Sequence, residues 1–375
     1  MGSPFDWREW RNRLIARPGF QSWAADFPLT RPVAQRRAQS LFDITAGFVY
    51  SQILYACVEL DLFDRLAQGP RPLSELAPAM RMTEAQADRL LRAAVALDLL
   101  ERRGADAAGS PRVGLGNHGA AMLGNPGIAA MVRHHRMLYR DLEDPLALLR
   151  GERSETELGR YWAYAGSRDP AQEADGAVSE YSELMSVSNA FVAGDVLDAY
   201  SLKGSRLLMD VGGGQGTFLL AAAERWPHLR VRLFDLPAVA ARAQRRFDDL
   251  GLADRAEAVG GDLMTTPLPK GADVCSLVRV VHDHDDDQAM RILRAVRAAL
   301  EPGGTLLLAE PMAETPGAEP IGDAYFGLYL LAMGSGRPRP PRELKAMLRE
   351  ARFGRIRLRR TRRPMQTRLL TAQAV

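Results

Sequence analysis

The chain has 375 residues, of which 46% are hydrophobic and 25% are charged, close to the average for folded soluble proteins. This composition excludes disordered, collagen-like and disulfide-scaffold proteins, and a net charge of +3 is too small to indicate nucleic-acid binding by the whole chain. We find no uninterrupted apolar run of the ~20 residues that cross a bilayer and no signal peptide, so we expect a cytoplasmic protein. Cys57 and Cys275 lie in apolar stretches and are expected to be buried, reduced thiols.

The N-terminal third predicts an arm followed by a helical module. Residues 1–38 are rich in tryptophan, arginine and proline, and predict an irregular arm. Residues 39–125 predict a module of winged-helix type, with helical periodicity from residue 41 to residue 66. Thr83 is expected to cap a later helix, and a ribbon is expected to pair residues near 100 with residues near 113.

A winged helix can bind DNA or serve as a structural and dimerisation module. Its second helix, Glu84 to Leu100, mixes acidic and basic side chains and has no basic cluster that could follow a phosphate backbone. We therefore expect dimerisation and no nucleic acid as a partner. Residues 126–200 again show helical periodicity and predict a connector that lines a substrate pocket.

From residue 201 to residue 375 the pattern alternates between strands and helices with short links. The expected strands are 206–211, 231–235, 257–260, 274–281 and 305–310, and the expected helices between them are 217–225, 238–247 and 286–300. This alternation predicts a parallel, doubly wound α/β sheet. Ligands of such sheets bind at the carboxyl ends of the strands, so residues there are the candidates for a functional site.

A glycine-rich loop, residues 212–216, follows the first strand of this sheet. Its glycines allow a sharp turn and a close approach of a ligand to the main chain, which makes Gly212 and Gly214 candidate binding residues. The dinucleotide pattern G-x-G-x-x-G would need glycine at position 217, where this chain has Thr217. The loop therefore indicates a site for S-adenosylmethionine, with a purely structural turn as the alternative.

The ends of the next two strands extend this prediction. Asp235 is expected to accept hydrogen bonds from both ribose hydroxyls, or to cap the helix that follows it. Asp262 is expected to bond the adenine amino group, while Leu263 and Met264 pack against the ring. Three strand-end features in this order indicate S-adenosylmethionine more specifically than the glycine loop alone.

The fourth strand leads into residues 282–287, which hold two histidines and four aspartates. Imidazole and carboxylate are common metal ligands, but His282 and His284 would point to opposite sides of a continued strand, and Asp285–Asp287 fit the first turn of a helix. We therefore expect no metal. Because imidazole titrates near neutrality, His282 is interpreted as a general base, with a structural histidine as the alternative.

Two carboxylates are candidates to orient His282. Glu310 ends the fifth strand and is expected to accept the second imidazole proton, as a buried acid does in a catalytic triad. A helix-capping or surface role for Glu310 is the alternative. Asp283, the neighbour of His282 in the chain, is the other candidate.

Together these segments resemble the plant caffeate and acetylserotonin type of O-methyltransferase; they are 210–216, 234–237, 261–264, 282–283 and 309–311. The likeness covers residues 40–375. It implies a Rossmann-like methyltransferase domain, an N-terminal all-helical winged-helix dimerisation domain and an intertwined homodimer. It also implies S-adenosyl-L-methionine as cofactor, S-adenosyl-L-homocysteine as product, His282 as the base, and cofactor contacts at Gly212, Asp235, Asp262, Leu263 and Arg279.

Within this family, residues 41–52 and 278–286 look like the bacterial carotenoid branch, the hydroxyneurosporene or demethylspheroidene O-methyltransferases of purple phototrophs. The branch implies a lipophilic substrate, a 1-hydroxycarotenoid methylated on its tertiary hydroxyl. This chain departs from plant members at three positions. Arg279 replaces their lysine and His284 replaces their tryptophan. Their second glutamate would fall near Pro338 and is missing from this chain. Asp283 and Glu310 are thus left to orient His282.

Two other functions stay open. One is O- or C-methylation of another small molecule, such as a bacteriochlorophyllide, a phenol or a polyketide. The other is a non-catalytic, cofactor-sensing winged-helix regulator, against which His282 and Glu310 argue. Residues expected to line a long apolar pocket, or else to form ordinary core, are Met185, Phe191, Tyr325, Phe326, Tyr329, Leu330 and Met333.

The C-terminal segment Arg355–Arg363 alternates arginines with Ile356 and Leu358. This alternation predicts an antiparallel strand with one basic face. Such a face is either solvated or attracted to anionic lipid headgroups, which would place the enzyme peripherally at the inner, photosynthetic membrane.

Overall fold

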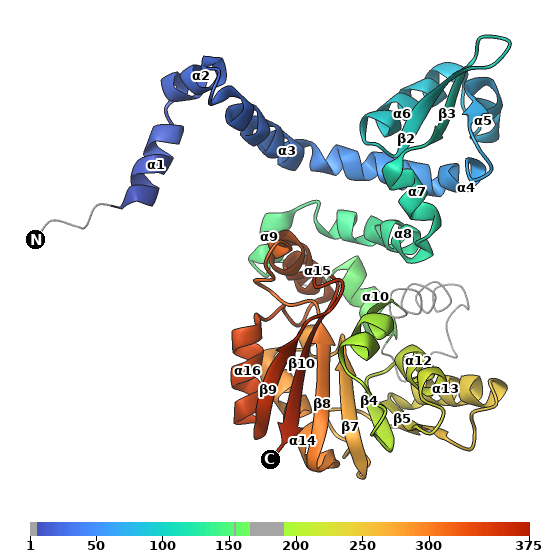
Figure 1. Cartoon of the computed structure of the whole chain (residues 1–375), viewed down its shortest axis with the longest axis vertical. Coiled ribbons are helices and arrows are strands. Elements are labelled where there is room, and N and C mark those ends of the chain that lie inside the picture. The colour runs from blue at the N-terminus through green and yellow to red at the C-terminus, as the bar shows by residue number, and fades with distance from the viewer. Residues whose placement is uncertain (1–5, 154, 166–190) are drawn as a thin grey trace, which may run out of the picture. The chain divides into compact units, whose positions relative to one another are not determined.

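The computed structural model describes residues 6–153, 155–165 and 191–375 (Figure 1). The chain divides into two compact units, Met1–Asn125 and Pro126–Val375. The first unit holds the arm and the winged-helix module, and the second holds the connector and the α/β sheet. Cys57 in the first unit and Cys275 in the second are buried free thiols, as predicted.

Helices replace the irregular arm predicted for residues 1–38: α1 (Trp7–Ile15), α2 (Pro18–Asp26) and the first part of α3 (Arg31–Glu59). Asp6 caps α1 by accepting the backbone N–H groups of Arg8 and Glu9. Prolines lie in the first turns of α2 and α3, where a missing N–H costs no helical hydrogen bond. The prediction was wrong because these prolines start helices instead of breaking them.

Helix α3 is long and apolar enough to cross a bilayer by length and composition alone, which the sequence analysis did not predict. Its most apolar 18-residue window has a mean hydropathy of 1.4, and 11% of that window is buried. Asp61 has a left-handed φ of 49°, which ends the helix and separates it from α4 (Leu62–Arg65). The helical periodicity from 41 to 66 therefore belongs to two helices.

The rest of the first unit is a winged helix, although not an all-helical one. It contains α5 (Leu73–Ala79), α6 (Glu84–Ala96), α7 (Asn117–Leu123), β1 (Arg71–Pro72), β2 (Leu100–Ala105) and β3 (Pro111–Leu115). Thr83 caps α6 in a capping box with Gln86. Strands β2 and β3 pair antiparallel with Arg102 opposite Val113, which confirms the ribbon, and β1 adds a third strand beside β3.

The second unit begins with helices that precede the sheet. They are α8 (Pro126–Asp141), α9 (Pro145–Leu149), α10 (Glu157–Ala165) and the helical residues 191–199. Leu138 and Leu148 pack with Leu158 and with Tyr329 of α15 (Phe326–Met333), which follows a π-helical turn at Pro320–Tyr325. Met185, predicted to line a pocket, lies outside the described residues.

The sheet of the second unit is mixed, whereas a parallel one was predicted (Figure 1). Its strands are β4 (Leu207–Val211), β5 (Arg230–Asp235), β6 (Ala256–Gly260), β7 (Ala272–Val278), β8 (Leu300–Glu310), β9 (Phe353–Arg359) and β10 (Arg368–Ala374), in the order β6-β5-β4-β7-β8-β10-β9. The first five are parallel. Strand β10 runs antiparallel to both of its neighbours, β8 and β9. The segment predicted from the C-terminal arginines is β9, which pairs antiparallel with β10 and runs in the same direction as the five parallel strands.

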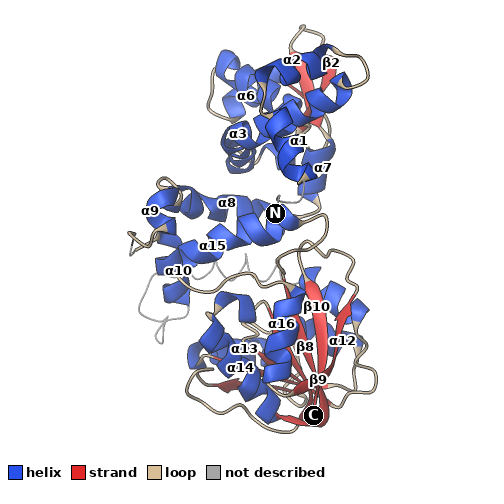
Figure 2. Ribbon diagram, turned by 90° about the vertical axis from the view of Figure 1, so that its left-hand side faces the viewer, coloured by secondary structure: helices blue, strands red, loops and turns tan. Residues whose placement is uncertain are grey.

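Helices cover both faces of this sheet: α12 (Thr217–Arg225), α13 (Pro237–Asp249), α14 (Asp286–Ala299) and α16 (Pro341–Glu350) (Figure 2). Leu306 packs in one buried cluster with side chains of α14 and α16. Its neighbour Leu307 packs in another with side chains of α12 and α13, because successive strand residues face opposite sides. The carboxyl ends of the five parallel strands consequently meet at one open edge.

Candidate active site

The glycine loop between β4 and α12 is held in one shape by its own packing. Gly212, Gly214 and Gly216 have φ angles of 72°, 59° and 75°, in the left-handed region that favours glycine. Gly213 is required for a different reason, because a Cβ there would lie 2.4 Å from Asp210 Oδ2. The loop therefore exposes main chain at the edge of the sheet, as a closely approaching ligand requires.

Asp235 supports this loop from the end of β5. Its Oδ2 accepts the N–H of Gly214 at 2.8 Å, and its Oδ1 accepts the N–H of Leu236 at 2.7 Å. Leu236, not Asp235, occupies the N-cap position of α13, so the capping alternative does not hold. Burial raises the pKa of Asp235 to about 6.

The ends of β6 and β7 bring further predicted residues to the same edge. Asp262 Oδ1 accepts the N–H of Met264 at 2.8 Å, which shapes the turn that carries Leu263. Strand β7 ends at Val278, three residues before the predicted end at Val281. There Arg279 adopts a left-handed φ of 58° and donates its N–H to Ala309 O, so the chain turns out of the sheet.

His282 lies in the 3₁₀ turn Val281–Asp283 and is 3% exposed. Burial, followed by the nearby charges of Arg279 and Arg339, lowers the pKa of the imidazole to about 3. His282 Nε2 lies 3.2 Å from Asp283 Oδ1. His282 Nδ1 is buried and has no hydrogen-bond partner among the described residues. A neutral imidazole whose Nδ1 has no hydrogen-bond partner among the described residues is able to accept a proton on that nitrogen.

Glu310 contacts His282 differently from the prediction. Its Oε2 accepts the backbone N–H of His282 at 3.1 Å, and it is the carboxylate of Asp283 that contacts the imidazole. The early end of β7 explains this, because the 3₁₀ turn presents its backbone to β8. Glu310 is fully buried, which excludes the surface alternative, and burial raises its pKa to about 8.

No cluster of metal-ligating side chains occurs within residues 6–153, 155–165 and 191–375. Asp285 takes the N-cap position of α14 but accepts the N–H of Gly336 instead of capping the helix. Asp286 and Asp287 lie in the first turn of α14, as predicted. The acidic segment thus has structural partners.

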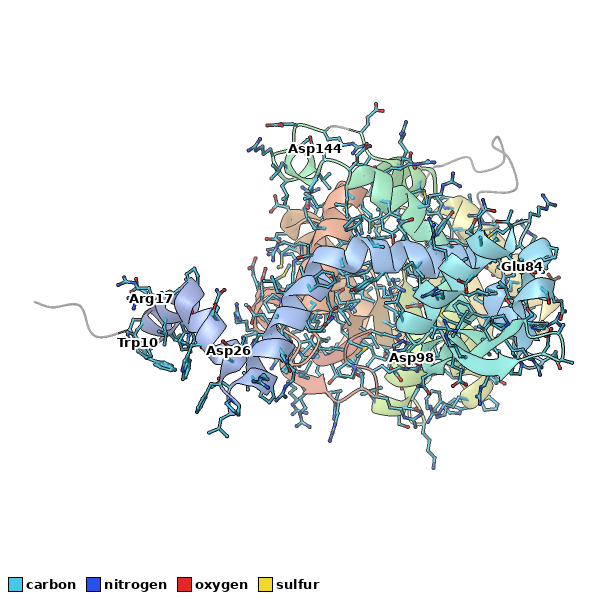
Figure 3. All side chains as sticks on the ribbon, turned by 90° about the horizontal axis from the view of Figure 1, so that it is seen from above. Trp10, Arg17, Asp26, Glu84, Asp98 and Asp144 are labelled. Carbon is cyan, nitrogen blue, oxygen red and sulfur yellow. The ribbon has the colours of Figure 1, made fainter. Side chains whose placement is uncertain are left out.

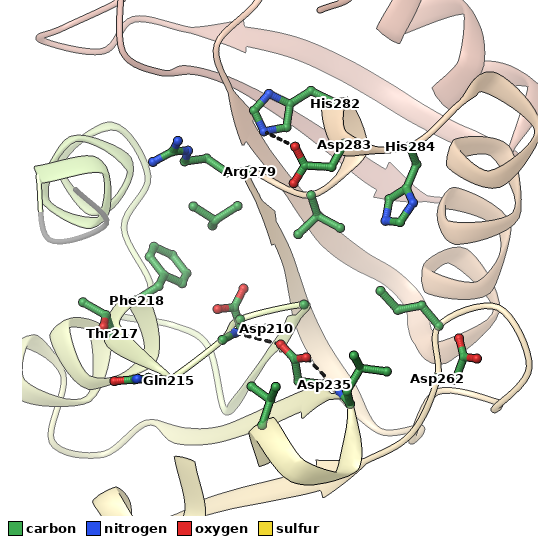
Figure 4. Close-up of a pocket in the computed structure, with 18 of the residues that line it drawn as sticks. Asp210, Gln215, Thr217, Phe218, Asp235, Asp262, Arg279, His282, Asp283 and His284 are labelled. Atoms are coloured by element: carbon green, nitrogen blue, oxygen red, sulfur yellow. Dashed lines mark hydrogen bonds and ion pairs between the residues drawn. The ribbon is translucent and has the colours of Figure 1, made fainter. Parts of the chain in front are cut away.

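One cavity of about 350 Å³ connects these residues (Figure 4). Asp210, Asp235 and Asp262 lie on one side of it, and Arg279, His282 and Asp283 lie on the other. Other predicted site residues in its wall are Gly212, Gly214, Leu263, Phe326, Tyr329, Leu330 and Met333. Glu310, Phe191 and Tyr325 are not among its lining residues. Phe191 instead packs beneath the Arg363 guanidinium, 4.9 Å from its ring centroid.

Family models match both parts of the chain. The model of the O-methyltransferase domain matches residues 139–354, and that of the O-methyltransferase dimerisation domain matches residues 42–123. The chain belongs to the O-methyltransferase family. The family and the fold predicted from the sequence motifs are therefore confirmed.

Relatives of this O-methyltransferase include two enzymes of similar length. Demethylspheroidene O-methyltransferase of Cereibacter sphaeroides is 41% identical over 92% of this chain and 89% of its own, and that of Rhodobacter capsulatus is 42% identical over 92% and 84%. Among solved structures, CalO1, a methyltransferase in calicheamicin biosynthesis with S-adenosylhomocysteine bound, superimposes with a TM-score of 0.73. That pair shares 26% identity over 90% of this chain and 98% of CalO1.

Asp210, two residues before the glycine loop, has a role that the sequence analysis left unassigned. Its Oδ1 accepts the Ser276 hydroxyl at 2.6 Å, while its Oδ2 is buried without a partner in the part of the chain that is described. Two carboxylates, Asp210 and Asp235, thus line the cavity beside bare main chain. These acceptors fit S-adenosylmethionine, which carries hydroxyl and ammonium donors and a positively charged sulfonium.

Arg339 is a second residue that sequence reasoning missed. Its side chain is fully buried and donates to Val281 O at 2.9 Å and to His284 O at 2.7 Å, on either side of His282. It also forms an ion pair with Asp286 at 2.7 Å. The guanidinium therefore fixes the turn of the methyltransferase that carries His282. No local motif marks this role, because the partners lie more than fifty positions away.

Two histidines of α8 contact tyrosines that were predicted as apolar pocket lining. His134 Nε2 and Tyr329 Oη lie 2.7 Å apart, and so do His135 Nε2 and Tyr325 Oη. Burial lowers the pKa of both imidazoles to about 4, so both are neutral at pH 7. These pairs fix the hydroxyl ends of tyrosines whose positions were predicted only as apolar lining.

Proposed function

We propose that this chain transfers the methyl group of S-adenosylmethionine to the tertiary hydroxyl of a 1-hydroxycarotenoid. The observation that carries the proposal is the 41–42% identity to two demethylspheroidene O-methyltransferases over 92% of the chain. The cavity supports it, because a cradle for the cofactor and a buried imidazole share one space with Phe326, Leu330 and Met333. A lipophilic acceptor suits that apolar part of the wall.

The cofactor would be held by the glycine loop and by Asp210, Asp235, Asp262 and Leu263. When bound, it would supply an electrophilic methyl group on a sulfonium sulfur, whose carbon–sulfur bond breaks as the acceptor oxygen bonds the methyl carbon, leaving S-adenosylhomocysteine. Asp235 presents a partly buried carboxylate to ribose hydroxyls while it anchors Gly214. Leu263 and Met264 offer an apolar surface to the adenine ring.

His282 would take the proton of the acceptor hydroxyl. Its lowered pKa keeps the imidazole neutral at physiological pH, and Asp283 stabilises the imidazolium that forms. A tertiary alcohol is a very weak acid, so its proton leaves only as the new carbon–oxygen bond forms. Alignment of acceptor and methyl group therefore supplies a large share of the rate, and general-base help adds a factor of ~10² to 10⁴.

The test incubates the purified chain with methyl-labelled cofactor and 1-hydroxycarotenoid in detergent, beside simple phenols and chlorophyll precursors. We expect label in the carotenoid, and a loss of about 10²-fold or more in turnover for His282→Ala with cofactor affinity close to the native value. Calorimetric titration of the cofactor is the control for folding. Label only in the phenols or precursors would overturn the carotenoid proposal, and near-native turnover of the variant would overturn the role of His282.

We also propose that the enzyme is a homodimer that works in the cytoplasm, peripherally at the inner membrane. The match of residues 42–123 to the O-methyltransferase dimerisation domain supports the first part. So does a row of exposed apolar side chains on α3, namely Leu41, Phe42, Ile44, Phe48 and Val49. The lipid solubility of the proposed acceptor supports the second part.

A further inference from the structure

The first two helices present large aromatic side chains to the exterior. Trp7 is 56% exposed and Trp23 is 51% exposed, and Trp10 and Phe27 are also exposed. Ala24 is the one buried residue of α1 and α2. Residues 6–30, which we call the aromatic arm, thus contribute almost nothing to the core of their own unit.

The aromatic residues of this arm are gathered on one side of each helix. Phe20, Trp23 and Phe27 are spaced by three and four positions in α2 and its end, and Trp7, Trp10 and Leu14 are spaced in the same way in α1. The rings contact one another, with centroids 5.3 Å apart for Trp23 and Phe27 and 5.6 Å apart for Trp7 and Trp10. Each helix therefore has an apolar face whose tryptophans are about half exposed, while Leu14 and Phe20 are partly buried.

Arginines flank these faces. The arm itself contains four arginines against three acidic residues, and Arg31, Arg36 and Arg37 follow it at the start of α3 without a further acidic residue. Arg13 is paired with Glu9, whereas the ion pairs of the described chain include no partner for Arg8 or Arg17. Figure 3 shows Arg17 and Trp10 at the end of the first unit remote from Glu84. Exposed tryptophans next to unpaired arginines are typical of helices that lie in the interface of an anionic bilayer.

The C-terminal strand, which the sequence favoured for this role, is less suitable. Arg362 pairs with Asp198 and Arg363 pairs with Asp195, so part of its charge is neutralised within the unit. Arg359 donates to Thr371 on the neighbouring strand. Only the exposed Arg355 and Arg357 remain on the face of β9, and Ile356 and Leu358 beside them are half-buried.

We propose that the aromatic arm docks this enzyme onto the surface of a bilayer with anionic headgroups, with the tryptophans at the level of the headgroups. A second copy of the chain is the competing occupant of these faces. The dimerisation match begins at residue 42, beyond the arm, and the excess of arginine suits an anionic surface better than an identical, equally basic arm. The inference rests on the proposed function, because an acceptor dissolved in the bilayer requires the enzyme to reach the bilayer surface.

The test is flotation of the full chain with phosphatidylcholine vesicles and with vesicles that also contain phosphatidylglycerol. We expect binding to the anionic vesicles that weakens with added salt, and a roughly tenfold loss of binding for the combined variant Trp7→Ser, Trp10→Ser and Trp23→Ser. The matched control is Arg355→Gln with Arg357→Gln, which should bind like the native chain.

Two further measurements separate the possible outcomes. The tryptophan variant should keep the native mass in light scattering and the native turnover with acceptor in detergent. The proposal would be overturned if this variant floated like the native chain, or if the native chain did not bind anionic vesicles. It would also be overturned if the mass of the variant fell to that of one chain, because the arm would then belong to a contact between copies. Failure of the proposed function would appear instead as absent carotenoid labelling in detergent, where docking plays no part.

Discussion

The carboxyl of Asp210 is buried at the end of β4, and burial raises its pKa to about 7. In the unfolded chain an aspartate ionises near pH ~3.9. At a pH between these two pKa values, Asp210 is therefore protonated in the folded chain and ionised in the unfolded chain. The contribution of Asp210 to stability is consequently present at low pH and is lost as the pH rises through about 7.

We expect Asp210→Asn to raise the midpoint of thermal unfolding by several degrees at pH 8 and by less at pH 5. Asparagine can keep the hydrogen bond from Ser276 and cannot ionise. Asp198→Asn is the contrasting control, because a hydrogen bond from Arg225 lowers the pKa of Asp198. Scanning fluorimetry at both pH values checks this, and an equal gain at pH 5 and pH 8 would contradict the assignment.

At the scale of elements, the segment from Ser335 to Arg339 acts as a clamp on the 3₁₀ turn of His282. Arg337 donates its N–H to His282 O at 2.9 Å, and a Cβ at Gly336 would lie 2.2 Å from the same oxygen. Arg339 holds the turn from its other side. The orientation of His282 is thus set by a loop far away in the sequence.

We expect Arg339→Lys to lower kcat by roughly tenfold to a hundredfold, because lysine cannot reproduce the forked contacts to Val281 O and His284 O. The KM for the cofactor should change little, since the glycine loop is untouched. Steady-state kinetics separate the two parameters. Arg337→Lys, at a partly exposed residue of the same clamp, is the matched control and should lose less. Parallel losses of kcat and of cofactor affinity would instead indicate general unfolding.

At the scale of the whole molecule, the apolar row on α3 bears on assembly. Phe48 is 70% exposed, although it lies within the segment matched by the dimerisation model. We expect Phe48→Glu to convert the proposed dimer to single chains, because the contact would bury a charge without a partner. Light scattering of the purified variant measures this. Leu250→Glu, at an exposed leucine of the second unit, is the control; an unchanged dimer in both variants would contradict the assigned interface.

Local pattern determined the five parallel strands and the candidate residues at their carboxyl ends, but not the antiparallel strand β10. Helix α12 begins and ends where predicted, at Thr217 and Arg225, because the glycine loop marks its start and Pro227 follows its end. Gly212, Asp235 and Asp262 were predicted to meet because parallel strands end at one edge, and they line one cavity. The motifs that carried this inference are short, contiguous and tied to strand ends.

Tertiary structure alone decided which groups surround His282. Because the chain turns early after β7, the imidazole of His282 contacts Asp283, and Glu310 contacts only the backbone N–H of His282. Arg339 contacts the same turn from a loop more than fifty residues away. The lowered pKa of His282 and the raised pKa of Asp210 both arise from burial, which no single residue's neighbours in sequence specify. Sequence by itself determines the helices, strands and turns that depend on consecutive residues. Contacts between distant segments, and the low dielectric around buried groups, exist only in the folded chain.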